Sequence, residues 1–289
     1  MAEVRLTVGN VEILVMHDAE SALPLEMTFP QVAPAAWAPY KERFPEAFSG
    51  PDNIRAHFEC YLIRSQGQTI LVDTGIGTAA SNPGTIEGLL GGSVEGKLVS
   101  ELNSAGIQPG GIDMVFLTHL HPDHVGWNLS GGGASPAATF PNARYVAHQA
   151  DWDAFSSPKD EEIFGFTYWE ETVAPLERLG VLDLLDGEKS LTSEITAITT
   201  PGHTPGSMSL SISSLGQSAL ILGDVFHNPA QITETDWIFS FDSDPDQAVQ
   251  TRGRMVDHAE AGNTPMAICH TTGFGRVVRV EGRRYWQAL

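Results

Sequence analysis

Three histidines and an aspartate fall within six residues of one short stretch, THLHPDHVGW: His119, His121, Asp123 and His124. Imidazole nitrogens and carboxylate oxygens are ligands of zinc, iron and manganese. Pro122 biases His121 toward extended geometry, because a proline disfavours the helical region for the residue before it. In an extended segment His119 and His121 point to the same side. The spacing predicts two imidazoles facing one metal ion, with the last two residues facing a second ion; a chance polar loop is the alternative.

Three further candidate ligands follow apolar, strand-like runs elsewhere in the chain: His203 in TTPGHTPGS, Asp224 in LILGDVFH and His270 in AICHTTGFG. Each comes at the C-terminal end of its run, as His119 does after IDMVFLT (112–118). A single histidine after a strand is an ordinary core or surface residue. Candidate ligands at four strand ends together predict one convergent metal site.

Short runs rich in β-branched and aromatic residues dominate the chain, and helical segments separate them. The predicted strands are 11–16, 58–64, 69–75, 112–118, 143–148, 195–200, 208–212, 218–224, 266–270 and 276–280. The predicted helices are 94–105, capped by Ser93, 171–180, and a third with Asp244 as N-cap and Pro245 in its first turn. This order predicts an α/β protein whose sheets are covered by helices.

No linker or low-complexity tract divides the 289 residues. We therefore expect a single domain over residues 1–289, with residues 1–57 as an N-terminal extension packed on it. The sequence leaves the role of two regions undecided. Loop 77–92 is either a lid or an ordinary connection. The aromatic side chains of the extension and of one later loop form either an apolar mouth or core packing: Trp37, Tyr40, Phe44, Phe48 and Phe274.

The charge is strongly acidic: 16 Lys and Arg against 36 Asp and Glu give a net charge of −20. Such a field repels nucleic acids and anionic membranes, so the expected partner is a small molecule. No run approaches the roughly 18 to 20 apolar residues of a membrane-spanning helix. The first residues do not form a secretory signal, and Cys60 and Cys269 are expected to be reduced core thiols. We expect a soluble, cytoplasmic protein; the sequence does not indicate its oligomeric state.

The HxHxDH motif, followed by the GH, GD and H signals, resembles the metallo-β-lactamase fold superfamily from Phe58 to Gly275. The resemblance implies an α/β fold of four layers, an αββα sandwich, with metals at one edge between the two sheets. It also implies that Asp73, in ILVDTG, steadies the ligands. Such outer carboxylates fix the tautomers of metal-binding imidazoles.

The same resemblance assigns the ligands of two divalent metal ions. It implies that His119, His121 and His203 hold the first ion. The second would be held by Asp123, His124 and His270, and Asp224 would bridge the two. Zinc is the expected metal, with manganese and iron left open.

Two neighbouring cations would lower the pKa of a bridging water and hold a hydroxide ready to attack a carbonyl or phosphoryl centre. Asp123 would be both ligand and proton acceptor, the role that the family gives to this aspartate. His227, three residues after Asp224, is the second candidate catalytic residue, reaching the substrate oxygen or leaving group; a supporting or surface histidine is the alternative. The sequence contains no G-x-S-x-G elbow, which agrees with a mechanism without a nucleophilic serine.

Several features narrow the resemblance to the methyl parathion hydrolase and N-acyl homoserine lactonase branch. Only 19 residues follow His270 in this sequence, which argues against the C-terminal helical domain of glyoxalase II-type enzymes. Asp224 replaces the cysteine of many true β-lactamases, and His121 replaces the glutamate of the flavodiiron branch. No tyrosine occurs between Tyr168 and Tyr285, although lactonases of this type usually have one near the site, so homoserine lactone specificity is an open question.

The sequence thus predicts a binuclear metal-dependent hydrolase of small neutral esters or lactones. Phosphotriester hydrolysis is the nearest alternative. A mononuclear iron dioxygenase acting on persulfides is a second alternative, disfavoured by the complete second ligand set with His124 and His270. A non-catalytic metal-binding module is a third, since fold alone does not decide function.

Overall fold

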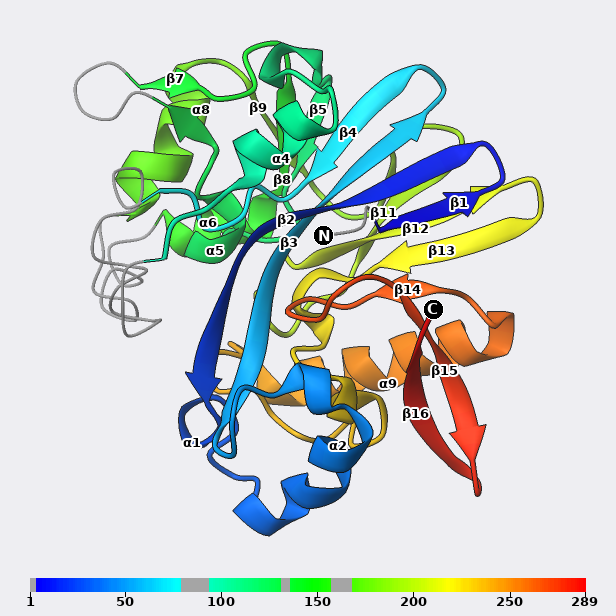
Figure 1. Ribbon diagram of the computed structural model, residues 1–289. Coiled ribbons are helices and arrows are strands. Elements are labelled where there is room, and N and C mark those ends of the chain that lie inside the picture. Colours follow the sequence, from blue (N-terminus) through cyan, green and yellow to red (C-terminus); the bar gives the residue numbers. More distant parts are fainter. Residues whose placement is uncertain (1–3, 79–93, 131–135, 157–167) are drawn as a thin grey trace.

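The computed structural model describes residues 4–78, 94–130, 136–156 and 168–289. Their strands form two large sheets and a small ribbon, seen in Figure 1. In order across the first sheet, the strands are β1 (Arg5–Val8), β2 (Val11–Pro24), β3 (Asn53–Ser65), β4 (Gln68–Val72), β5 (Met114–Phe116), β8 (Arg144–His148) and β9 (Leu182–Leu185). Those from β1 to β4 pair antiparallel, whereas β4, β5, β8 and β9 run parallel.

The second sheet is built from the C-terminal part of the chain. Its strands, in order, are β10 (Lys189–Ser190), β11 (Ile195–Thr199), β12 (Met208–Ser214), β13 (Gln217–Ile221), β14 (Met266–Ala267), β15 (Gly275–Val280) and β16 (Arg283–Ala288). Only the pairing of β13 with β14 is parallel in this sheet, and helix α9 (Pro245–Gly262) makes that crossover. The small ribbon pairs β6 (Leu129–Ser130) with β7 (Ala137–Ala138).

The remaining described elements are short helices. They are α1 (Leu25–Thr28), η1 (Pro34–Trp37), α2 (Ala38–Arg43), η2 (Pro45–Ala47), α4 (Leu98–Ser104), η3 (Pro109–Gly111), α5 (Pro122–Val125), α6 (Gln149–Phe155), η4 (Trp169–Val173), α8 (Ala174–Arg178), η5 (Gly223–Val225) and η6 (Pro229–Ile232). Among the described segments, no helix combines the length and the apolarity that crossing a membrane requires.

Three buried apolar clusters define the layers. The middle cluster joins the two sheets face to face, for example Ile63 of β3 with Leu210 of β12. A second cluster packs Leu98 and Leu102 of α4 on the other face of the first sheet. A third packs Met255 of α9 and several N-terminal aromatic residues on the other face of the second sheet. The order helix, sheet, sheet, helix confirms the expected αββα sandwich.

The N-terminal strands reach further than their apolar runs indicate. β2 continues to Pro24 and β3 starts at Asn53, and both extend beyond the rest of the first sheet toward α1 and α2 (Figure 1). The aromatic residues of this region are core rather than an open mouth: Trp37, Tyr40, Phe44 and Phe48 are all buried, and so is Phe274. The four N-terminal rings pack largely against one another and against Trp237.

One predicted turn and one predicted helix cap agree with the structure, whereas the two other predicted helices differ from it. The hairpin turn between β3 and β4 and the Asp244 cap of α9 are confirmed; the Asp244 side chain accepts the Gln247 N–H at 3.0 Å. The helix expected over 94–105 starts only at Leu98, because its first peptide N–H groups bond to Asp18 and not to a local cap. The helix expected over 171–180 is divided into η4 and α8 next to Pro175, which lacks the N–H that a regular helix needs.

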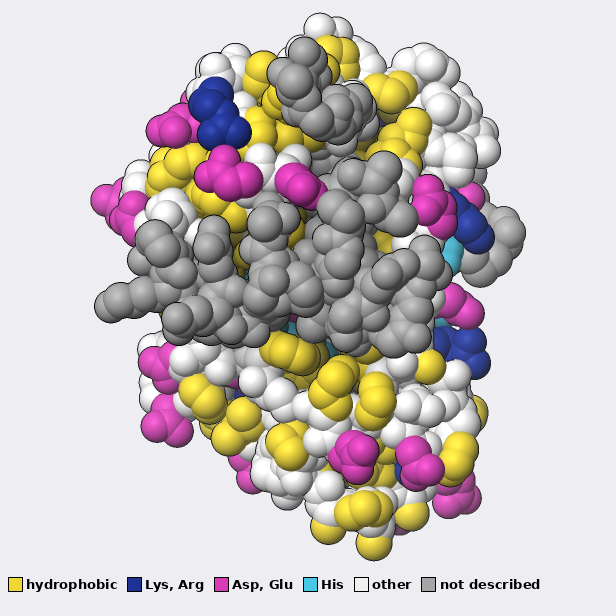
Figure 2. All heavy atoms as spheres, turned by 90° about the vertical axis from the view of Figure 1, so that its left-hand side faces the viewer, with side chains coloured by type: hydrophobic (Ala, Val, Ile, Leu, Met, Phe, Trp, Pro, Cys, Tyr) yellow, Lys and Arg dark blue, Asp and Glu magenta, His cyan; other side chains and the backbone are white. Residues whose placement is uncertain are grey.

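Two expected features fall on residues outside the described ones. The Ser93 cap is among them, and so is nearly all of the loop 77–92 that was considered as a lid. Where side chains are described, the surface reflects the acidic composition: Figure 2 shows acidic side chains spread above and below the middle of one face, with Lys and Arg in few places.

Candidate metal centre

The seven predicted ligands meet at one edge of the sandwich. Four of them follow β5 of the first sheet: His119, His121, Asp123 and His124. The other three follow β11, β13 and β14 of the second sheet: His203, Asp224 and His270. All but Asp123 are buried. Because strand ends from both sheets deliver these side chains to one place, the sandwich itself positions the site.

A first group consists of three imidazoles. The His121 Nδ1 atom lies 3.1 Å from His119 Nε2 and 2.9 Å from His203 Nε2. His121 has the extended backbone expected before Pro122, with ψ 154°. Ligands of a tetrahedral ion with bonds of about 2.0–2.1 Å lie about 3.3 Å apart, so these nitrogens are spaced as ligands of one cation.

The tautomers of His119 and His124 are set by hydrogen bonds at the Nδ1 atom of each ring. Thr118 donates its hydroxyl to Asp73 at 2.8 Å and therefore accepts from His119 Nδ1, 3.1 Å away. Asp73 Oδ2 also contacts His124 Nδ1, at 2.9 Å. A carboxylate can only accept, so both imidazoles carry a proton at Nδ1 and turn the lone pair of Nε2 toward the site. This is the geometry that the prediction for Asp73 requires.

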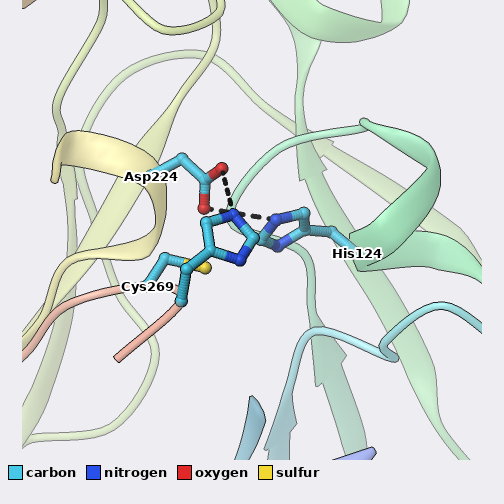
Figure 3. A group of neighbouring side chains, drawn as sticks. His124, Asp224 and Cys269 are labelled. Atoms are coloured by element: carbon cyan, nitrogen blue, oxygen red, sulfur yellow. Dashed lines mark ion pairs between the residues drawn. The ribbon is translucent and has the colours of Figure 1, made fainter. Parts of the chain in front are cut away.

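A second group surrounds Asp224. The Oδ1 atom of Asp224 lies 3.2 Å from His124 Nε2, and its Oδ2 atom lies 3.4 Å from both His203 Nε2 and His270 Nε2. Asp123 Oδ2 is 3.5 Å from His124 Nε2 and 3.8 Å from His270 Nε2. Figure 3 shows His124 and Asp224 pointing toward one another from separate elements. Asp224 therefore lies between the two groups, as a bridging ligand would.

The donors fit a pair of divalent cations. The buried His124 Nε2 and Asp224 Oδ1 atoms have no hydrogen-bond partner among the described residues. Buried polar atoms are rarely left without a partner. Burial lowers the pKa of His119 and of His121 well below the ordinary histidine value, so both are neutral ligands at pH 7. Burial raises the pKa of Asp123, but His124 and His270 together lower it further, and the carboxyl stays ionised.

His227, the second predicted catalytic residue, is fully buried. Its Nε2 atom lies 3.2 Å from Asp224 Oδ2, and its ring stacks on Phe239 with centroids 3.6 Å apart. Burial lowers its pKa to about 4, so the ring is neutral at pH 7. His203, Asp224 and His227 also form a group of donors close enough to hold an ion. His227 therefore lies directly beside Asp224, and its role in the reaction stays a prediction.

The sequence did not single out three buried aspartates that brace the site. Asp18 accepts the peptide N–H groups of Ile76 and Leu98 and the indole N–H of Trp127, at 2.7–2.8 Å. A Cβ atom on Gly75 would lie 2.2 Å from the Asp18 carboxylate, so only glycine allows that approach. Asp18 thereby ties strand β2 to the segments on either side of the motif.

The other two aspartates hold the His203 turn. Asp151 accepts from the Gly206 N–H at 2.6 Å and from the Thr204 hydroxyl at 2.9 Å. Asp242 lies 3.1 Å from His203 Nδ1 and pairs with the buried Arg252 at 3.2 Å. Because Asp242 accepts the proton on His203 Nδ1, the Nε2 atom of His203 carries the lone pair that can bind a metal ion.

Cys269 also lies beside the second group. It was expected to be a core thiol; it is free and buried, and Figure 3 shows it next to His124 and Asp224. Its sulfur and donor atoms of His124, Asp224 and His270 lie within 4.8 Å of one another. Burial raises the pKa of the thiol. Its position directly before His270 is the sequence signal that would have placed it here.

The fold and the site together define a class of protein. Residues 59–270 match the model of the metallo-beta-lactamase superfamily, and the chain belongs to this family. An N-acyl homoserine lactonase of a Bacillus species is 29% identical over 174 residues, 56% of this chain and 61% of the lactonase. The chain thus spans less than two thirds of that relative. The uncharacterized protein YobT of Bacillus subtilis (strain 168) is 27% identical over 244 residues, 80% of this chain and 88% of YobT.

Solved structures show the same fold over almost the whole chain. The hydrolase AbOPH of the beta lactamase superfamily superposes with a TM-score of 0.81 at 23% identity, covering 99% of this chain and 97% of that one. The dizinc quorum-quenching lactonase AidC, solved with a product bound, gives 0.80 at 22% identity with the same coverage. Identities this low establish the fold and leave the substrate open.

Proposed function

We propose that this protein is a binuclear metal-dependent hydrolase of small neutral esters or lactones. The observation that carries the proposal is the position of Asp224 between two groups of imidazoles, within 3.2–3.4 Å of His124, His203 and His270. When bound, two divalent cations would supply a Lewis acid and a water molecule of lowered pKa. His119, His121 and His203 would hold the first cation, and Asp123, His124 and His270 the second, with Asp224 shared.

Asp123 is the residue best placed to move a proton. Its side chain is 23% exposed, whereas the Asp224 side chain is 4% exposed. Its pKa lies below the ordinary aspartate value because the contacts with His124 and His270 together outweigh the effect of burial, so the carboxylate is ionised at neutral pH and can accept a proton. We propose that it takes the proton of the attacking water and passes it to the leaving alkoxide.

Two observations support a neutral substrate of the ester or lactone class. The net charge of −20 disfavours anionic substrates. The relatives include enzymes named N-acyl homoserine lactonases. His227 and Phe239 fill the space beside Asp224, and the tyrosine usual in such lactonases is missing from 169–284. We therefore propose lactones and esters as the class without assigning homoserine lactones.

The first test measures metal content and then hydrolysis. Protein purified without added metal or chelator should carry about two zinc or manganese ions per chain. A panel of neutral lactones, aryl esters and phosphotriesters should then give the largest kcat/KM with a lactone or ester. Turnover of phosphotriesters alone would favour the alternative hydrolase. A single iron with oxygen consumption on persulfides would contradict the proposal.

Replacing Asp123 with asparagine should lower kcat by about 100-fold or more, because a positioned proton acceptor contributes at least that much. The matched control is Asp153→Asn on α6, an exposed aspartate that accepts from Gln149. Metal analysis of both variants separates lost chemistry from lost ions. Hydrolysis at the wild-type rate in Asp123→Asn, with the ions retained, would refute the proton-transfer role.

A further inference from the structure

A second cluster of metal-ligating side chains lies on β2 and β3, outside the centre described above. His17 is paired directly opposite Glu59 in the antiparallel register, and His57 is paired opposite Glu20. A β-bulge at Asp18 inserts one extra residue between the two pairs. The bulge returns Glu20 to the face that carries His17, so four donors share one face of the ribbon.

The donor atoms converge. One atom each of His17, His57 and Glu59 lies within 4.8 Å of the others. The fourth residue, Glu20, places its Oε2 atom 3.6 Å from His57 Nδ1, and its side chain is 51% exposed. A tetrahedral ion with bonds of about 2.0–2.2 Å needs donors about 3.3 Å apart, which small side-chain rotations provide here.

The cluster has polar groups that the described protein does not satisfy. His17 Nδ1 and His57 Nδ1 are buried and make no hydrogen bond with described residues. Glu59 accepts the Gly273 N–H at 3.2 Å, and no described lysine or arginine forms an ion pair with it. A carboxylate taken out of water without a cation is unfavourable. A bound cation would satisfy the imidazole lone pairs and the carboxylate together.

The protonation state of His17 also suits a metal ligand. Burial lowers the pKa of His17 below the ordinary value, so this ring is neutral at pH 7, as a metal ligand must be. Two imidazoles and one carboxylate form a donor set that suits zinc and related divalent ions.

We propose that His17, His57 and Glu59 form a third divalent-cation site, of the zinc class, with Glu20 or water as the remaining ligand. The site is linked to the main centre through the backbone. The His57 N–H bonds to the His270 carbonyl at 3.3 Å, and Glu59 holds the Gly273 N–H. His270 itself has a left-handed backbone, with φ 56°, which costs energy for a residue with a side chain. An ion here would stabilise the strand segment on which that turn rests.

The test is a zinc titration followed by calorimetry, starting from protein whose main centre has been filled and whose excess metal has been removed. Wild-type protein should bind one further equivalent, and that equivalent should raise Tm by several degrees, because it binds only the folded state. His17→Asn and Glu59→Gln should each lose this equivalent and its Tm shift while keeping the other bound ions. The control is His258→Asn, an exposed histidine on α9, which should keep it.

Circular dichroism of each variant verifies that it is folded. A wild-type titration that shows no further equivalent would overturn the proposal. So would a further equivalent that survives in both His17→Asn and Glu59→Gln. The test measures zinc binding and Tm, so its result does not depend on hydrolase activity. The third site can be confirmed or refuted in an inactive protein, and hydrolase activity alone does not establish it.

Discussion

Replacing Asp224 with asparagine should empty the metal centre and remove hydrolysis. The carboxylate of Asp224 lies 3.2–3.9 Å from the Nε2 atoms of five histidines, and among the described carboxylates only Asp123 would remain beside these Nε2 atoms. Loss of an outer partner of a ligand already costs about 10–100-fold in metal affinity. Loss of a shared ligand should therefore weaken binding by about 100-fold or more, with kcat/KM falling in parallel.

The measurement is metal content after gel filtration, together with hydrolysis of the best substrate from the panel. Asp183→Asn is the matched control: its carboxylate is 50% exposed and pairs with Arg144 on the surface. That variant should keep both the ions and the activity. If Asp224→Asn retained two ions and a tenth of the activity, the shared-ligand role of Asp224 would be wrong.

The largest effect on stability is expected for Arg252→Met. Arg252 and Asp242 form an ion pair at 3.2 Å with both side chains buried, and Asp242 also bonds to His203. Removing one partner of a buried pair leaves an uncompensated charge, which costs about 3–5 kcal/mol of unfolding free energy. Burial raises the pKa of Asp242, and the contact with His203, together with smaller contributions from His227 and Arg252, brings it below the ordinary value. The Arg252→Met variant therefore removes the cation that pairs with this buried carboxylate.

Urea unfolding of metal-free protein measures this effect, because it separates the ion pair from the contribution of bound ions. Arg254→Met is the control on the same helix: Arg254 is exposed and donates to the Thr199 carbonyl at 2.9 Å. An exposed substitution of this kind changes stability by about 0.5 kcal/mol or less. Equal stabilities of the two variants would show that the Arg252 pair contributes nothing.

The residues whose convergence the sequence predicted are those whose signal is local. The spacing within His119 to His124, and the position of His203, Asp224 and His270 directly after apolar runs, are visible in a few residues each. The extended geometry of His121 follows from the proline beside it. A strand that ends at a sheet edge delivers the next side chain to that edge, so the convergence was predictable too.

The residues that were missed act over long separations in the chain. Asp18 reaches Leu98, 80 positions away, and Asp242 reaches His203, 39 positions away. An aspartate that will be buried with distant N–H donors looks the same in a sequence as one on the surface. For the same reason α4 starts later than its local pattern indicates, because its cap is Asp18. The β2 continuation to Pro24 was hidden because HDAESALP breaks the apolar run after a bulge.

The division of the ligands between the two sheets has a consequence for how the protein assembles. Four ligands follow β5, and three come from the ends of β11, β13 and β14. Neither half of the chain carries all of the predicted donors, so the proposed ions would bind only after the two halves have docked. Their binding free energy then adds to the cohesion of the interface between the sheets. In the proposed hydrolase, the metal ions therefore bind late in folding. Removing them with a chelator should destabilise the whole sandwich as well as empty the metal site.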